Sequence, residues 1–177
     1  MEPKEWMLKK KYFLRKGMIN ALVKEARGKE SMMLRTLSRE EVYDYMVSKL
    51  NYCSRKEKEI NDSIPYIEEG DICYIDFGNA YINEAGYLHF GLVLSLNNRK
   101  AFVVPMTSNE KTVSASVYKD HLFPFPKVEG LNKKSALFLN DAKWINTARI
   151  IDVKAHIDPM SALFLKIQQS IIDLIVL

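Results

Sequence analysis

Apolar residues in the first third of the chain follow the spacing that is typical of helices. Met18, Leu22 and Ala26 recur every four positions, while charged residues such as Lys24 occupy the other side. A helix with this pattern has one apolar face and one solvated face. Gly28 follows the pattern and is expected to end the helix, because glycine is favoured at helix C-termini.

A second helix is predicted to begin at Ser38. Ser38 and Glu41 have the S-x-x-E spacing of a capping box, in which each side chain accepts a hydrogen bond from the other residue's backbone N–H. The helix is expected to run through the charged stretch 55–59 and to end before Pro65, with a linker at 61–69. Its apolar stripe contains four residues: Val42, Met46, Leu50 and Cys53.

From residue 70 onward the pattern changes to short apolar runs separated by turn residues, which is typical of strands. Asn97 and Asn98 tolerate positive φ and fit a hairpin turn between two of these runs. The segment 123–127 fits a proline-rich turn. Several short strands with frequent turns indicate a small, strongly bent barrel. The expected strands are residues 72–77, 88–95, 101–106, 114–118, 136–139 and 143–145.

The last part of the chain is expected to form a long helix. Asp158 fits an N-cap and Pro159 fits the first helical position. The helix has more apolar surface than one small barrel buries, so residues 161–177 are expected to form a homodimer contact or to contact the N-terminal region. Its apolar face contains Met160, Leu163, Phe164, Ile167, Ile171, Leu174 and Ile175.

Composition and charge narrow the class of protein. The chain has 177 residues, 47% hydrophobic and 27% charged, which excludes a disordered chain, a collagen-like repeat or a bare coiled coil. Residues 1–66 contain 15 Lys and Arg against 10 Asp and Glu, whereas residues 67–177 contain 11 against 12. The basic first third is either a nucleic-acid contact or a solvated helix surface.

The cysteines and the hydrophobic segments indicate where the protein resides and whether it contains a structural metal. Cys53 and Cys73 match no zinc or CxxC spacing, so two reduced thiols without a structural metal are expected. The first 16 residues are charged throughout and lack the apolar region of an export signal. Residues 161–177 are interrupted by polar side chains, so no span of a bilayer is expected. We therefore expect a cytoplasmic protein.

Four segments of the second half contain the residues that suggest chemistry. They read GDICYIDFG at 70–78, HFGLVLS at 89–95, VVPMTSN at 103–109 and SALFLNDAKWINTARI at 135–150. In this order and at this spacing they resemble the MazF/PemK family of toxin–antitoxin endoribonucleases. The resemblance covers roughly residues 68–177 and leaves the first 66 residues as a helical extension, so the expected domains are 1–66 and 67–177.

The resemblance implies a fold, an activity and partners. The fold would be α+β and mostly β: a small SH3-like barrel with a long C-terminal helix, preceded by the helical N-terminal extension. The activity would be sequence-selective cleavage of single-stranded RNA without a metal or other cofactor. The partners would be RNA, a cognate antitoxin and a second copy of the chain, with DNA bound only by the toxin–antitoxin complex.

The resemblance also assigns candidate catalytic residues. Thr107 matches the family's threonine, and Ser108 beside it is a second hydroxyl donor. The family's arginine position holds His89, which departs from the pattern and shifts the expected role toward proton transfer, since histidine changes its charge near neutral pH. The loop residue Glu84 is a candidate for orienting or accepting the 2′-hydroxyl proton.

Further residues are candidates for substrate binding. Strand alternation places His89 on the side of Gly91, which is expected to leave room for a ligand. Arg149 and Lys143 are candidate contacts to RNA phosphates, although each could instead pair with Asp141 or Asp152 at the surface. The complete set of substrate-binding candidates is Gly78, Asn79, Gly91, Lys111 and Arg149.

Other functions remain open on the sequence alone. His89 could be a half-buried structural histidine, and Thr107 with Ser108 could cap a turn. The change from arginine to histidine keeps open an inactive MazF-like module that binds nucleic acid or a partner protein. In a third possibility, residues 1–66 contact DNA and the barrel dimerises, but these residues lack a recognisable helix-turn-helix spacing.

Overall fold

The chain folds into two compact units, which comprise residues 1–43 and 44–177. The computed structural model describes residues 3–15, 17–57 and 65–176. The division between the units lies inside helix α4 (Arg39–Glu57), upstream of the boundary expected at residues 66 and 67. Of the expected linker at 61–69, residues 61–64 lie outside the described residues, and 65–69 are irregular apart from a turn.

The first unit is helical, as expected. It contains α1 (Pro3–Leu8), α2 (Lys10–Phe13), α3 (Met18–Leu34) and the first residues of α4. Gly28 does not end α3, and this prediction is wrong: the helix continues to Leu34, because a glycine inside a helix costs only about 1 kcal/mol. The capping box is confirmed, since Ser38 N–H donates to Glu41 Oε2 at 2.8 Å and Glu41 N–H donates to Ser38 Oγ at 3.2 Å.

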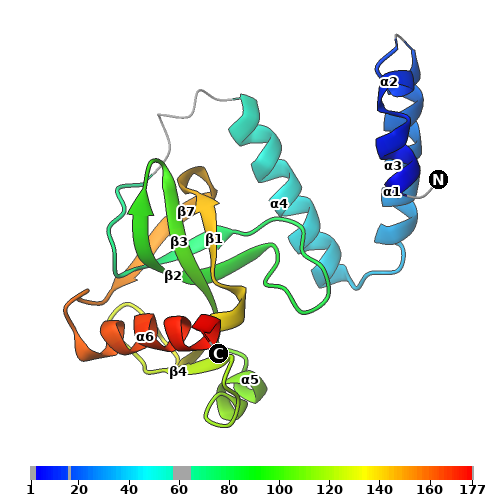
Figure 1. The fold of residues 1–177 in the computed structure, drawn as a ribbon. Helices are drawn as coiled ribbons and strands as arrows, with labels where there is room; N and C mark the ends of the chain where they lie inside the picture. Colours follow the sequence, from blue (N-terminus) through cyan, green and yellow to red (C-terminus); the bar gives the residue numbers. More distant parts are fainter. Residues whose placement is uncertain (1–2, 16, 58–64, 177) are drawn as a thin grey trace. The chain divides into compact units, whose positions relative to one another are not determined.

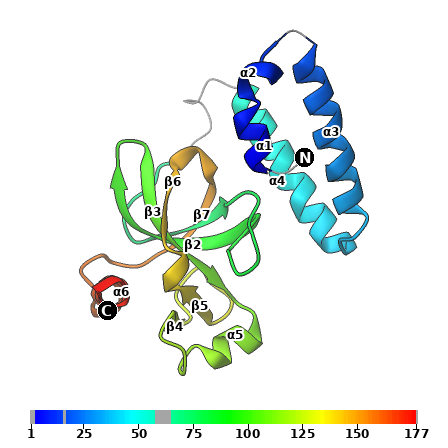
Figure 2. The same ribbon diagram turned by 45° about the vertical axis from the view of Figure 1, so that its right-hand side comes forward.

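The second unit is built on an antiparallel sheet of seven strands (Figures 1 and 2). The pairing order is β4-β5-β3-β2-β1-β7, and β6 also pairs with β3. Since the order has two ends, the sheet is open and does not close into a complete barrel. The expected fold class, mostly β with a C-terminal helix, is confirmed. The strands are β1 (Asp71–Asp76), β2 (Leu88–Asn97), β3 (Lys100–Thr107), β4 (Leu122–Phe125), β5 (Ser135–Phe138), β6 (Lys143–Asn146) and β7 (Ile150–His156).

Five of the six expected strands are confirmed within a few residues, and they correspond to β1, β2, β3, β5 and β6. The hairpin turn between β2 and β3 lies at Asn98 and Arg99, one residue later than expected, with φ of 45° and 61°. Asn97 pairs with Lys100 across this turn. Two consecutive residues at positive φ are what a tight two-residue hairpin requires.

Two other local expectations do not hold, and one strand was not predicted. The segment expected to be a strand at 114–118 instead contains the last two residues of helix α5 (Glu110–Ala115) and the turn after it. The N-cap of α5, Asn109, accepts hydrogen bonds from Lys111 N–H and Thr112 N–H. The expected turn at 123–127 overlaps β4, where Pro124 is exposed on the outermost strand, a position that tolerates a missing N–H. Strand β7 was not expected, and it pairs with β1.

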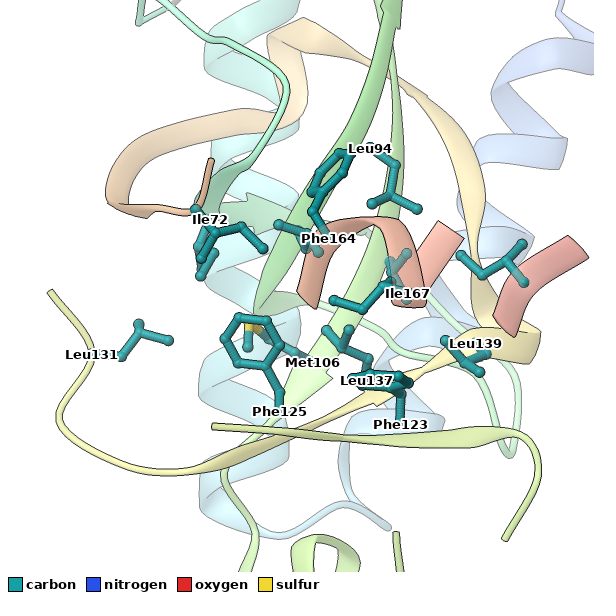
Figure 3. Close-up of a cluster of buried hydrophobic side chains, with 14 residues drawn as sticks. Ile72, Leu94, Met106, Phe123, Phe125, Leu131, Leu137, Leu139, Phe164 and Ile167 are labelled. Carbon is teal, nitrogen blue, oxygen red and sulfur yellow. The ribbon is translucent and has the colours of Figure 1, made fainter. Parts of the chain in front are cut away.

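The main core lies between the sheet and α6 (Ala162–Val176), as Figure 3 shows. Phe164 and Ile167 of α6 are 2% and 0% exposed and lie in one cluster with Phe125 and Leu137. The helix begins later than expected: Ser161 Oγ accepts from Phe164 N–H at 3.2 Å, whereas the Asp158 carboxylate bonds only the Met160 N–H in the preceding turn. None of the described helices is long and apolar enough to cross a membrane.

Helix α4 contacts the sheet with a polar face, which is opposite to the expectation. Its predicted apolar stripe is largely exposed, with Met46 at 41% and Leu50 at 66%. The face that contacts β1 instead contains Ser48 and Asn51, whose side chains donate to the Asp76 carboxylate at 2.7 and 2.6 Å. A buried carboxylate needs such donors. Tyr45, one turn before Ser48 on the same side of α4, is also buried, at 8% exposed, and its ring packs against that of Tyr87.

Candidate functional site

His89 and Thr107 lie at the same end of the neighbouring strands β2 and β3. Phe90 of β2 and Met106 of β3 form the last pair of this ladder, and His89 and Thr107 are the next residues on the two strands. Residues directly opposite in an antiparallel pair share a face of the sheet. Because side chains alternate along a strand, both lie on the face opposite to that of Phe90 and Met106. His89 also pairs with Ile75 of β1. The structure therefore brings two of the candidate catalytic residues together at one end of the β2–β3 hairpin.

The imidazole of His89 is half-buried and incompletely hydrogen-bonded. Its Nδ1 is buried and has no hydrogen-bond partner among the residues that the structure describes. Buried polar atoms without a partner are uncommon in folded proteins. Nδ1 of His89 is therefore an unsatisfied polar atom inside the protein, out of reach of a ligand.

Thr107 and the residues after it form a capped turn. Thr107 Oγ1 accepts a hydrogen bond from Asn109 N–H at 3.2 Å, and Asn109 in turn caps α5. Accepting this bond leaves the hydroxyl proton of Thr107 available to donate. Ser108 and Lys111 are exposed beside it. The turn thus fixes the Thr107 hydroxyl while leaving its donor capacity intact.

The loop between β1 and β2 is closed at its base and anchored near its tip. Phe77 N–H donates to Tyr87 O, and Tyr87 N–H donates to Gly78 O, both at 2.7 Å. The carboxylate of Glu84 accepts from Tyr81 N–H at 3.1 Å within the loop, and Glu84 is exposed. Ala85 N–H donates to the Asp141 carboxylate at 2.5 Å. Glu84 therefore stabilises a turn in the loop, and Asp141 fixes the position of the loop.

Lys143 adds a positive charge on the same face as His89. It pairs with Val103 of β3, whose side chain lies on the face shared by Thr107. Its Nζ lies 2.6 Å from the Asp141 carboxylate and 5.7 Å from the centre of the Phe77 ring. The pairing of Lys143 with Asp141, considered from the sequence, is confirmed. Only the β3–β6 register shows that this lysine faces the same side as His89.

Gly91 does not open space for a ligand, so this expectation is wrong. Gly91 is buried, and a Cβ at this position would lie 2.9 Å from Ile75 Cδ1 and 3.3 Å from Phe77 Cζ. Two side chains of β1 and its following loop thus fill the volume over the glycine. A small residue is required here because the strands pack closely.

Three of the substrate-binding candidates gather in a different place. Gly78, Asn79 and Arg149 line a cavity of about 580 Å3 together with residues of α4. Arg149 Nη1 donates to the Asp76 carbonyl oxygen at 3.0 Å, so the arginine bonds a backbone carbonyl rather than the acidic side chains considered from the sequence. Asp76 directly follows Ile75, the partner of His89, so its side chain points to the opposite face of the sheet.

Titratable groups near the sheet show two clear perturbations. Burial, followed by the negative charges of Asp71 and Asp152, raises the pKa of the Cys73 thiol to about 12. A hydrogen bond from Lys154 lowers the pKa of Asp152. Cys73 is thus a buried, unreactive thiol and is no candidate nucleophile. Within residues 3–15, 17–57 and 65–176, no three His, Cys, Asp or Glu side chains cluster so that they could hold a metal ion.

An open, seven-stranded antiparallel sheet with a C-terminal helix over its core defines the class, and this class is the MazF-like fold. The crystal structure of MazF (Form-I) from Deinococcus radiodurans matches with a TM-score of 0.50 and 16% identity, covering 66% of this chain and 100% of that one. At this identity the likeness shows the fold.

Further solved structures show lower overall similarity. The MazE–MazF complex (Form-II) from Deinococcus radiodurans has a TM-score of 0.46 and 15% identity, and the match covers 66% of this chain and 99% of that one. An endoribonuclease in complex with its cognate antitoxin from a mycobacterial species has a TM-score of 0.47 and 13% identity, and the match covers 63% of this chain and 97% of that one. No protein-family model matches the sequence. No curated protein matches it either.

Proposed function

We propose that the protein is an endoribonuclease that cleaves single-stranded RNA and is the toxin of a toxin–antitoxin pair. The MazF-like fold and the four motifs quoted above support this assignment. The observation that carries it is that His89 and Thr107 lie at the same end of β2 and β3, directly after the last pair of that ladder. Lys143 supplies a cation on the same face.

The chemistry needs a base, an acid and a group that stabilises the phosphate. The ribose 2′-oxygen attacks the adjacent phosphorus as its proton passes to a base, and the bond to the 5′-oxygen breaks as that oxygen takes a proton. In the proposed site His89 transfers a proton, and Thr107 donates a hydrogen bond to a non-bridging oxygen. The products are a 2′,3′-cyclic phosphate and a 5′-hydroxyl.

The roles of the other residues follow from their positions. Lys143 is ion-paired with Asp141, and its ammonium keeps further N–H donors that can bind a phosphate oxygen. Glu84, which bonds the backbone of its own loop, acts by positioning that loop. Ser108 and Lys111 are exposed beside Thr107 and extend the RNA contact. The reaction is proposed to need no metal, because the described residues around His89 lack a set of metal-ligating side chains.

The proposed partners are an antitoxin and a second copy of the chain in the cytoplasm. Helix α6 buries Phe164, Ile167 and Ile171 in its own subunit but leaves Leu165 at 50% and Ile172 at 53% exposed. These two residues are seven positions apart and share a face of the helix. A second copy that covers this outer face would bury them.

RNA cleavage by the purified protein in excess EDTA tests the function. We expect fragments that end in 2′,3′-cyclic phosphate, with the rate falling when His89 or Thr107 is replaced. Activity that disappears with the chelator and returns with magnesium would refute the proposed mechanism. Intact RNA under all conditions would refute the enzyme itself.

The alternative function is an inactive MazF-like module that binds RNA or a protein. Two observations favour it: histidine stands at the family's arginine position, and the space over Gly91 is filled by Ile75 and Phe77. Such a module would bind RNA without cutting it. The same assay, run together with a gel-shift measurement, separates the two functions.

A further inference from the structure

The cavity beside α4 is built by two rows of side chains on one helix. Ser48, Asn51 and Arg55 follow the spacing i, i+3, i+7, and all three hydrogen-bond to Asp76, to Ile150 or to each other. Lys49, Tyr52 and Lys56 form the neighbouring row with the same spacing, and all three line the cavity. The first row holds the helix on the sheet, and the second row presents cations and an aromatic ring.

The charge in the cavity is strongly unbalanced. It is lined by Lys49, Arg55, Lys56 and Arg149 and by a single carboxylate, Asp76. That carboxylate already accepts hydrogen bonds from Ser48 Oγ, Asn51 Nδ2 and Gly78 N–H. In the described part of the chain, Arg55, Lys56 and Arg149 make no ion pair with a carboxylate. The cavity therefore attracts an anion.

Hydrogen bonds to backbone carbonyls hold the guanidinium groups of Arg149 and Arg55 in place before a ligand binds. Arg149 Nη1 donates to Asp76 O at 3.0 Å, and Arg55 Nη2 donates to Ile150 O at 3.3 Å. A guanidinium has five N–H donors, so each arginine keeps further donors after these bonds. Planar guanidinium groups held in this way suit the oxygens of a phosphate.

The cavity also contains aromatic rings interleaved with its cations. Lys49 Nζ lies 6.0 Å from the centre of the Tyr45 ring, and Lys56 Nζ lies 5.9 Å from that of Tyr52. Tyr52 is 59% exposed, so its face can stack on a nucleobase. A volume of about 580 Å3 lies in the range of sites for drug-sized ligands and fits one nucleotide.

We propose that this cavity binds the sugar–phosphate backbone of single-stranded RNA, one or two nucleotides at a time, as a second contact apart from the His89 face. Arg149, Arg55 and Lys56 bind phosphate oxygens, and Tyr52 stacks on a base. The choice of RNA as the ligand rests on the proposed function. Asp76 and His89 point to opposite faces of the sheet, so the cavity and the His89 face are separate contacts for the RNA.

Fluorescence anisotropy with a labelled 12-nucleotide RNA tests this site. The measurements use full-length protein with the His89→Ala substitution, in EDTA, so that the RNA is not cut during the titration. In this background, Lys56→Gln and Arg149→Gln should each weaken RNA binding about 3- to 10-fold. Each should also make the plot of the logarithm of the binding constant against the logarithm of salt concentration less steep, by about 0.7. Tyr52→Ala should weaken binding about 5- to 100-fold, whereas Tyr52→Phe should bind as the parent does. Lys133→Gln, at an exposed loop lysine, is the matched control.

The outcomes separate this proposal from the proposed function. Variants of Lys56, Arg149 and Tyr52 that bind like the Lys133→Gln control, with unfolding midpoints unchanged, would overturn the cavity site even if the wild-type protein cuts RNA. Equal or tighter binding to duplex DNA of the same sequence would also overturn it. Conversely, a wild-type protein that cuts no RNA, while these variants weaken RNA binding, would refute the enzyme and support the cavity.

Discussion

The attachment of α4 to the sheet depends on one buried carboxylate, and removing it should destabilise the second unit strongly. Asp76 is 4% exposed and accepts three hydrogen bonds, from Ser48 Oγ at 2.7 Å, Asn51 Nδ2 at 2.6 Å and Gly78 N–H at 3.0 Å. Asp76→Ala leaves all three donors without this acceptor. Ser48 is itself 4% exposed, so no water replaces the lost bond easily.

The size of the effect follows from the hydrogen bonds. One hydrogen bond to a charged group contributes about 1.5–3 kcal/mol, and an unsatisfied buried donor costs about 1–3 kcal/mol. We expect Ser48→Ala to lower the free energy of unfolding by about 2 kcal/mol and Asp76→Ala by about 4 kcal/mol. Because both changes remove the same bond, the double variant should lose less than the sum of the two.

Urea denaturation measures these differences. With a slope near 2 kcal/mol per molar, Asp76→Ala should lower the urea midpoint by about 2 M. Asp120→Ala, which removes an exposed carboxylate, is the matched control and should stay within about 0.5 kcal/mol of the parent. A loss below about 1 kcal/mol for Asp76→Ala, or strict additivity with Ser48→Ala, would show that α4 is not held by this carboxylate.

Four further predictions concern catalysis, assembly, the core and pH. His89→Ala should lower the rate of RNA cleavage about 10²–10⁴-fold. If the imidazole transfers a proton, His89→Arg should lower the rate nearly as much, and measured cleavage rates of the two variants test this. Leu165→Glu should shift sedimentation from dimer to monomer, because the side chain is 50% exposed on the outer face of α6. Phe164→Ala should lower the free energy of unfolding by about 3–5 kcal/mol in urea, because the ring is 2% exposed in the core. Burial raises the pKa of the Cys73 thiol from 9.0 to about 12, so between these pH values only the unfolded state loses this proton. The free energy of unfolding, measured in urea, should therefore fall by about 1.4 kcal/mol per pH unit in this range. The Cys73→Ala variant should lack this contribution.

Local sequence determined the elements whose residues interact with near neighbours. The capping box of Ser38 and Glu41 and the turn at Asn98 bond within a few residues, so their patterns predicted them well. The register of the β2–β3 hairpin follows from that turn. Beyond Ser95 a bulge shifts this register by one residue, so the turn alone does not predict which residue of β3 lies beside His89.

Elements whose environment comes from distant segments were predicted less well. Pro124 suggested a turn, and only the sheet order shows that it lies on an edge strand where its missing N–H costs little. Gly91 suggested open space, yet Ile75 and Phe77 from another strand fill it. In both cases the residue type is compatible with two environments, and the packing of other segments selects between them.

The cavity beside α4 is the part that only the tertiary structure decided. Local amphipathicity favoured burial of Met46 and Leu50, but the buried carboxylate of Asp76 turned the opposite, polar face inward. Ser48 is 28 residues from Asp76 in the sequence, and Arg149 is 73 residues from it. Periodicity within one helix cannot reveal a hydrogen-bonding requirement that arises on a strand so far along the chain, and this requirement placed the cations of α4 beside Arg149.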